Sequence, residues 1–398
     1  MDSSQIKLKE VVPAHLVVGW KKKLVFAISM VHILFIAVSS YRNPLTAWMV
    51  LNKLMKMRKR VNGKLPIPRY IKSNGRYYWS SHSPGWPSME FNIFIKNELN
   101  RIRPFKSGNN SLQTMIFAVT NKCHLSCEHC FEWDNLNTAE RLSLMDLKSI
   151  LDKFQKRGIS QVQLSGGEPL ARFNDLLELM KSAQSGTDFW LLTSGLGLTY
   201  EKALQLKEAG LAGVNISLDH WSETRHNAFR NNEKSFYWVK EAAANCRNVD
   251  LVVCFSICTV QDFISRENLI KYLTLAKTCG AGFIQLLEPR KVGHFADKNV
   301  ELNDQDKNVL ENFYFEINSD PAYRDMPTVM YPGYHQRKFG CFGAGNRYLY
   351  VDPNGEMHAC PFCQTKVGNA LTNPLDTGIT QLKEKGCQAF NTLLNDLN

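Results

Sequence analysis

Short apolar runs and amphipathic stretches of helical period alternate along the middle of the chain. The runs are rich in β-branched and aromatic residues and predict strands, while the stretches between them predict helices. The predicted strands span residues 112–120, 161–165, 188–193, 213–218, 251–259 and 283–287. The predicted helices span residues 143–157, 172–184, 200–209, 234–246 and 265–279. Strands joined by helical crossovers form a parallel sheet covered by helices, with the chemistry at the carboxyl ends of the strands.

The ends of the predicted helices carry residues that favour helix boundaries. Ser143 is a candidate N-cap, and Asp146, three residues later, suits the positive first turn of a helix. Gly158 and Gly210 follow helix ends, where a left-handed residue is commonly needed. The pattern as a whole predicts an α/β fold.

A longer apolar run occupies residues 24–38, directly after Lys21, Lys22 and Lys23. As a helix this run reaches about 22 Å, which is short of the roughly 30 Å hydrocarbon core of a bilayer. After Pro44, apolar residues recur at helical spacing within a basic stretch, a pattern typical of helices on anionic membrane surfaces. We therefore expect residues 1–60 to bind the cytoplasmic face of a membrane. A secretory signal and a buried helix pair are the alternatives.

The positive charge of the chain is concentrated in the same arm. The formal charge is +11, and residues 1–60 account for +9 of it. The rest of the chain is close to neutral, which argues against nucleic acid as a partner. Residues 61–111 follow as an aromatic-rich extension, for which plain packing, a lid and a substrate-contacting arm are all compatible with the sequence.

The chain has 11 cysteines, and an odd number in clusters is a poor disulfide framework. Clusters separated by lone thiols suit metal ligands in a reducing compartment, which favours a cytoplasmic location. The lone cysteines fall in predicted helices or strands, where small buried residues are expected: Cys246, Cys254, Cys258 and Cys279.

Three cysteines with the spacing Cys-x3-Cys-x2-Cys follow the first predicted strand, namely Cys123, Cys127 and Cys130. Three thiolates leave one position of a metal centre open, which is typical of a reactive site. A structural zinc site with His124 or His129 as fourth ligand is the alternative.

A glycine turn ends the second predicted strand, in the sequence Ser165-Gly166-Gly167-Glu168-Pro169. Two glycines allow the backbone to approach a ligand closely, and proline fixes the exit of the turn. Backbone carbonyls and the Glu168 carboxylate could hold an ammonium group there.

In this order, the cysteine run and the glycine turn resemble the radical S-adenosylmethionine (radical SAM) superfamily over residues 112–290. The cysteines match the family's three ligands to a [4Fe–4S] cluster, with His129 where the family usually has an aromatic residue. The glycine turn matches the family motif that holds the methionine amino group. The resemblance implies further cofactor-binding residues, namely Phe131, Thr193, Ser194, Ser217, Asp219 and Arg230. Two of these depart from the family pattern, because Ser194 replaces an asparagine and the segment around Arg230 is displaced by one residue.

The resemblance also implies a fold and a reaction. The fold is a partial (β/α)6 TIM-like barrel. In the reaction, an electron from a flavodoxin- or ferredoxin-type donor passes through the cluster and cleaves S-adenosylmethionine. The resulting 5′-deoxyadenosyl radical abstracts hydrogen from a C–H bond, while the protein positions the substrate and excludes solvent and oxygen.

A second cysteine-rich region lies near the C-terminus. Cys341 precedes two strand-like runs around a Pro-Asn-Gly turn, which is a hairpin signal, and Cys360 and Cys363 follow the hairpin. The region resembles the auxiliary-cluster domains called twitch or SPASM, which implies a second [4Fe–4S] cluster with Cys387 as a distant fourth ligand. A structural zinc site and a redox-active Cys-Pro-Phe-Cys pair are the alternatives.

The sequence therefore predicts a radical SAM enzyme with four parts: an N-terminal arm (1–60), an extension (61–111), a core barrel (112–300) and an auxiliary-cluster domain of hairpin and helix (330–398). Auxiliary clusters of this type are common in enzymes that modify peptides, so a peptide or protein is the first hypothesis for the substrate. A small molecule or lipid near the membrane is the second. A non-catalytic electron-transfer protein is the third, and the glycine turn argues against it.

Overall fold

The centre of the molecule is a nine-stranded sheet in the order β10-β9-β8-β7-β6-β5-β4-β11-β12. The structure is a computed structural model, and it describes residues 11–62, 65–105, 112–387 and 389–390. The strands are β4 (Thr114–Ala118), β5 (Gln161–Ser165), β6 (Asp188–Thr193), β7 (Leu211–Ser217), β8 (Val252–Cys258), β9 (Phe283–Leu287), β10 (Thr328–Met330), β11 (Tyr348–Val351) and β12 (Met357–His358). Neighbouring strands are parallel except β11 and β12, which form the predicted antiparallel hairpin. All six strands predicted for the core are thus confirmed, as β4 to β9.

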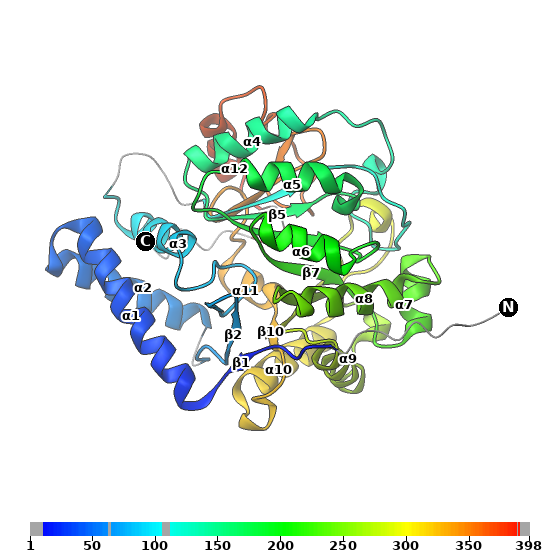
Figure 1. Cartoon of the computed structure of the whole chain (residues 1–398), viewed down its shortest axis with the longest axis horizontal. Coiled ribbons are helices and arrows are strands. Elements are labelled where there is room, and N and C mark those ends of the chain that lie inside the picture. The colour runs from blue at the N-terminus through cyan, green and yellow to red at the C-terminus, as the bar shows by residue number, and fades with distance from the viewer. Residues whose placement is uncertain (1–10, 63–64, 106–111, 388, 391–398) are drawn as a thin grey trace.

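Helices cover the sheet (Figure 1). Those in predicted positions are α4 (Leu144–Lys156), α5 (Phe173–Lys181), α6 (Tyr200–Glu208), α8 (Ser235–Asn248) and α9 (Arg266–Thr278). Further helices are α7 (Glu223–Arg230), α10 (Asp304–Ser319), α11 (Pro332–Phe339) and α12 (Leu375–Lys385). Ser143 and Asp146 form a reciprocal capping box at the start of α4, and Gly158 and Gly210 adopt positive φ angles after α4 and α6, as predicted.

One imidazole shows that the sheet is strongly curved. His82 Nδ1 lies 3.1 Å from Gln163 Nε2 on β5, and His82 Nε2 lies 3.2 Å from Gln285 Nε2 on β9. Three strands separate β5 from β9 in the sheet, so one side chain can contact both only across a concave interior. This curvature is that of a partial barrel, the predicted fold class.

The N-terminal arm and the extension that follows it form a layer at one end of the molecule (Figure 1, blue to cyan). Its elements are β1 (Leu16–Val17), α1 (Gly19–Tyr41), α2 (Pro44–Asn62), β2 (Tyr70–Ser73), β3 (Arg76–Tyr78) and α3 (Met89–Ile102). The helices α1, α2 and α3 pack against one another, and β1 to β3 form a small sheet. Polar contacts join this layer to the core, including hydrogen bonds from Asn97 Nδ2 to the Gly158 carbonyl and from Arg69 Nη2 to the Ile317 carbonyl.

Helix α1 is longer than the apolar run that predicted it, because it begins at Gly19. Its 23 residues reach about 34 Å, so its length and composition would allow it to cross a bilayer. Only 22% of its most apolar 18-residue window is buried, which argues against a buried helix pair. Association of the arm with a membrane stays a prediction, as do the domain boundaries.

Candidate active site

The loop after β4 places the three cysteines at the carboxyl end of the sheet. Cys127 is buried, Cys123 and Cys130 are half-buried, and all three line one cavity of about 800 Å³. Burial raises the pKa of the Cys123 thiol to about 11 and that of Cys130 to about 12, so both are protonated at neutral pH without a metal. A metal would reverse this, because coordination deprotonates a thiol.

The glycine turn packs directly against the cysteine loop. A Cβ atom on Gly166 would lie 2.3 Å from the Thr120 carbonyl oxygen, and one on Gly167 would lie 2.4 Å from the Lys122 carbonyl oxygen. Gly166 also has a φ of 143°, which side chains rarely allow. The Gly167 N–H donates to the Thr120 carbonyl and the Glu168 N–H donates to the Lys122 carbonyl. The two glycines therefore hold the turn against the loop that carries the thiols.

Glu168 joins the ends of β5 and β6. Its buried carboxylate accepts hydrogen bonds from Thr193 Oγ1 at 2.7 Å, from Ser194 N and Oγ at 2.8 and 2.6 Å, and from Leu170 N at 3.2 Å. Four donors occupy most of the acceptor capacity of a carboxylate. The turn's backbone carbonyls are therefore the better acceptors for an ammonium group, and Glu168 fixes their position.

A buried ion pair lies behind Cys127. Arg230 Nε and Nη2 each lie 2.6 Å from Asp219 Oδ2, and Arg230 Nη1 lies 3.4 Å from Cys127 Sγ. Burial alone would raise the pKa of Asp219, but Arg230, with smaller contributions from His129 and His226, holds it below its ordinary value. Arg230 therefore already has a carboxylate partner within the chain, and its cation favours a thiolate at Cys127.

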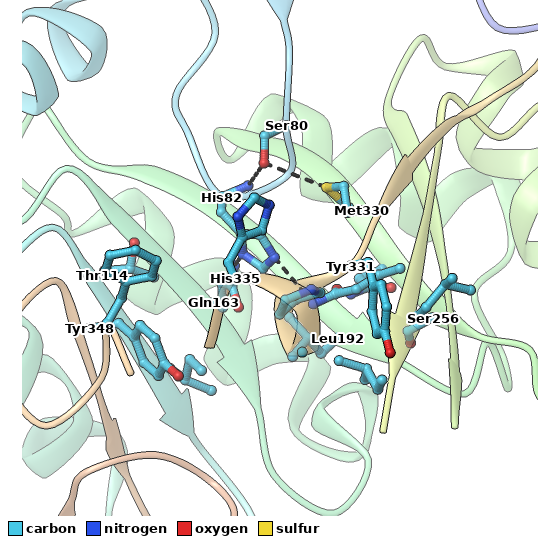
Figure 2. A pocket seen from close by; sticks show the side chains of 18 of the residues that line it. Ser80, His82, Thr114, Gln163, Leu192, Ser256, Met330, Tyr331, His335 and Tyr348 are labelled. Atoms are coloured by element: carbon cyan, nitrogen blue, oxygen red, sulfur yellow. Dashed lines mark hydrogen bonds between the residues drawn. The ribbon is translucent and has the colours of Figure 1, made fainter. Parts of the chain in front are cut away.

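Neutral polar side chains line the concave face of the sheet below the cysteines. Asn215 Nδ2 donates to Gln285 Oε1 at 3.0 Å, while Asn215 Oδ1 is buried with no partner among the described residues. Figure 2 shows His82 between Thr114 and Tyr348 on one side and Tyr331 and Ser256 on the other. Burial lowers the pKa of His82 to about 4, so its imidazole is neutral at physiological pH.

Aromatic side chains surround the cysteine loop. The His129 ring, where the family usually has an aromatic residue, stacks on Phe229 at 4.9 Å, and burial lowers its pKa to about 4. Phe131 packs edge-on against Tyr350 of β11 and against Phe362, which lies between Cys360 and Cys363 in the sequence. Phe131 therefore links the two cysteine-rich regions.

The four C-terminal cysteines converge, which the hairpin predicted for Cys341, Cys360 and Cys363. Hydrogen bonding between the Cys341 and Cys387 thiols lowers the pKa of Cys387 to about 6 and raises that of Cys341. Burial and the nearby Cys363 and Cys387 thiols raise the pKa of Cys360 to about 12. Cys360 also lines the 800 Å³ cavity, so both cysteine-rich regions face the same space.

The donor chemistry fits iron–sulfur clusters better than single metal ions. Within the described ranges, no three Cys, His, Asp or Glu side chains are grouped to hold one ion. A cluster does not need such a group, because each thiolate binds a different iron.

All the predicted site residues lie in the described part of the chain, and most line the cavity. Those that line it are Cys123, Cys127, Cys130, Phe131, Ser165, Gly166, Gly167, Glu168, Thr193, Ser194, Ser217, Asp219, Arg230 and Cys360. The rest are Pro169, which is buried, and three cysteines predicted as ligands of the second cluster, Cys341, Cys363 and Cys387. Their roles toward cofactors stay predictions.

Three residues at the site were not predicted from the sequence: His82, Gln285 and His294. The Nδ1 atom of His294 lies 2.9 Å from the Cys127 carbonyl oxygen. No sequence motif identifies these three residues, because each lies far in sequence from the cysteine loop and the glycine turn.

Comparison with known proteins gives a family match over the core. The model of the family described as "Radical SAM superfamily" matches residues 117–276. A PqqA peptide cyclase from Gluconobacter oxydans is 27% identical over 278 residues, covering 68% of this chain and 75% of that protein. An AdoMet-dependent heme synthase from Oleidesulfovibrio alaskensis is 25% identical over 302 residues, covering 68% of this chain and 75% of that protein.

Solved structures share the fold. Streptococcus suis SuiB bound to its precursor peptide SuiA superposes with a TM-score of 0.56 at 15% identity, covering 89% of this chain and 81% of SuiB. At this identity the likeness concerns the fold alone, and it extends beyond the barrel to most of the chain.

Proposed function

We propose that this chain, which belongs to the radical SAM superfamily and is a radical SAM enzyme, abstracts a hydrogen atom from a substrate held in the 800 Å³ cavity. One observation carries the proposal. The cysteine loop, the glycine turn and the carboxyl ends of β6, β7 and β8 all face this single cavity. Its volume lies within the roughly 300–1,000 Å³ typical of small-molecule sites.

The residues around the cavity fit the family's cofactors. Cys123, Cys127 and Cys130 would hold a [4Fe–4S] cluster, and the backbone carbonyls of the glycine turn would hold the amino group of S-adenosylmethionine. When bound and reduced, this pair of cofactors supplies the radical that abstracts hydrogen. The chain itself fixes the glycine turn through Glu168 and places the Arg230 cation beside Cys127.

A second cluster is proposed at the C-terminal cysteines. Cys341, Cys360, Cys363 and Cys387 provide four thiols, which is the full ligand number of a closed [4Fe–4S] cluster. Because Cys360 faces the cavity, such a cluster would lie on the same side as the substrate. A flavodoxin- or ferredoxin-type protein is the electron donor that we expect.

Two classes of substrate have support. A peptide is supported by the relatives, because one is called a peptide cyclase and SuiB was solved with a precursor peptide. A heme synthase at similar identity shows that relatives do not agree on one substrate. A small apolar molecule or lipid is supported by this chain itself, because helices α1 and α2 form part of the cavity wall.

The arm provides a surface that suits a membrane. The exposed side of α1 and α2 carries large apolar side chains: Trp20, Leu24, Ile28, Val31, Leu34, Phe35, Leu45, Trp48 and Met49. Lysines 21 to 23 and the basic end of α2 flank this surface. We therefore propose that α1 and α2 hold the enzyme at the cytoplasmic face of a membrane, where basic flanks favour anionic lipids.

Anaerobic reconstitution of the full chain tests the catalytic proposal. We expect about eight irons per chain and cleavage of S-adenosylmethionine under reduction by dithionite. The Cys127→Ala variant should lose cleavage, whereas Cys360→Ala should lose about four irons and keep cleavage. If neither change affected cleavage, the assignment of the cysteine loop would be wrong. A wild-type chain with about four irons would refute the second cluster.

A further inference from the structure

We propose that the cavity takes an amphiphile from the membrane, with its hydrocarbon chain against α1 and α2 and its uncharged polar head toward the cysteine loop. This inference rests on the proposed function, because it names the substrate class of the same site.

One end of the cavity is apolar and is built by the arm. Phe26, Met30 and Ile33 of α1 line it, together with Leu51 and Leu54 of α2. These positions recur at helical spacing, so each helix turns one apolar stripe toward the cavity. Hydrocarbon is the chemical group that such a wall binds without leaving polar atoms unpaired.

The opposite side of α1 is also apolar, but it faces outward. Ile28, Val31 and Phe35 are exposed, and the exposed fractions of Val31 and Phe35 are 69% and 70%. A helix of a soluble protein keeps one apolar stripe inside and presents polar residues outside. Because α1 is apolar on both sides, it suits a boundary between a bilayer and an internal hydrocarbon site.

A cluster of neutral polar side chains lies in the cavity beyond this wall. His82, Gln163, Gln285 and Asn215 cluster on the concave face of the sheet, and Asn215 Oδ1 has no partner among the described residues. These groups offer hydrogen bonds but no net charge, which suits hydroxyl, carbonyl or amide groups. Figure 2 shows His82 and Gln163 inside the cavity. The gradient from apolar wall to polar cluster is what an amphiphile requires.

A peptide fits this gradient less well. Every residue of a peptide carries a backbone N–H and C=O group that must be hydrogen-bonded when buried. Apart from Ser29 and Arg58, the side chains that α1 and α2 turn toward the cavity are apolar, while the backbone groups of both helices are engaged within the helices. A peptide bound there would leave most of its own polar groups unpaired.

Photo-crosslinking separates the inner wall from the outer surface. The full chain would be bound to phosphatidylcholine–phosphatidylglycerol vesicles containing a long-chain alcohol with a diazirine in its chain, illuminated, and mapped by mass spectrometry. We expect labels at the inner positions Met30 and Leu54 as well as at the outer position Phe35. Met30→Trp should fill the apolar end and lower labelling of Leu54 at least tenfold, with labelling of Phe35 unchanged. Val31→Trp is the control: it introduces a tryptophan at the next residue, which lies on the exposed side of α1, and it should leave labelling of Leu54 unchanged.

Each outcome decides between alternatives. An unlabelled inner wall in the wild-type chain, or equal labelling of Leu54 in Met30→Trp, would overturn the inference and leave a peptide as the substrate class. Thermal unfolding of Met30→Trp verifies that the variant is folded. Cleavage of S-adenosylmethionine is measured on the same reconstituted protein. Inner labelling without cleavage would refute the proposed function alone, whereas cleavage without inner labelling would refute the amphiphile alone.

Discussion

Replacing Arg230 with methionine tests the buried ion pair behind the cysteine loop. Methionine keeps much of the side-chain length but removes the charge that lies 2.6 Å from Asp219 Oδ2. Within the described part of the chain, the Asp219 carboxylate then keeps one hydrogen bond, from the Cys258 N–H at 3.2 Å. Removing one partner of a buried pair typically destabilises a protein by about 3–5 kcal/mol, because the other charge remains buried.

The pH dependence of this loss has a definite sign. In the wild-type chain the pKa of Asp219 is below its ordinary value, so the stabilisation is present above the unfolded pKa of about 3.9 and is lost only as pH falls through the folded pKa. Without Arg230, burial dominates and raises the pKa of Asp219 above the unfolded value. The variant should therefore lose stability as pH rises through that raised pKa.

Thermal unfolding of the metal-free, reduced full chain measures both effects. At neutral pH we expect Arg230→Met to melt at least about 6 °C below wild type, at about 2 °C for each kcal/mol, with a smaller deficit near pH 5. Adding Asp219→Asn removes the buried charge and should abolish the pH dependence of the deficit. A variant that melts within about 1 °C of wild type, or whose deficit is the same at every pH, would refute the reasoning.

Three further predictions concern the turn, the second cluster and the arm. Gly167→Ala places a Cβ 2.4 Å from the Lys122 carbonyl oxygen and should weaken S-adenosylmethionine binding in calorimetry; wild-type affinity would contradict the packing described for the turn. Cys387→Ala should lower the iron content by about one to four per chain, because the three remaining thiolates can still hold a cluster with one open iron, and an unchanged content would argue against Cys387 as a ligand. Phe35→Glu should weaken binding to anionic vesicles about tenfold or more in flotation, because a large exposed apolar side chain is lost. Met145→Glu, at an equally exposed position on α4, is the control, and equal losses in both variants would argue against α1 as the membrane surface.

The sequence predicted those parts of the molecule that depend on local pattern. The six core strands are continuous apolar runs between helical stretches. The cap of α4 could be predicted because the two residues that form it, Ser143 and Asp146, lie within four positions of each other. The role of Glu168 was less visible, because its partners Thr193 and Ser194 lie a full crossover away. His82 could not be found at all, since its position in the barrel depends on how the extension (residues 61–111) packs against the sheet. Strand β10 was missed because three residues are too short for a pattern.

Strand β11 lies beside β4, although 234 residues separate Tyr348 from its partner Thr114. During synthesis, one edge of β4 therefore stays without its neighbour until the hairpin has been made, which at about 5–20 residues per second is on the order of 10–50 s. An unpaired parallel edge is prone to association with other chains. Over the same interval, the loop that follows β4 has no hairpin against it, and Phe131 has neither Tyr350 nor Phe362 as a neighbour. Order of translation thus leaves the first cysteine run without its C-terminal neighbours until the second cysteine-rich region has been made.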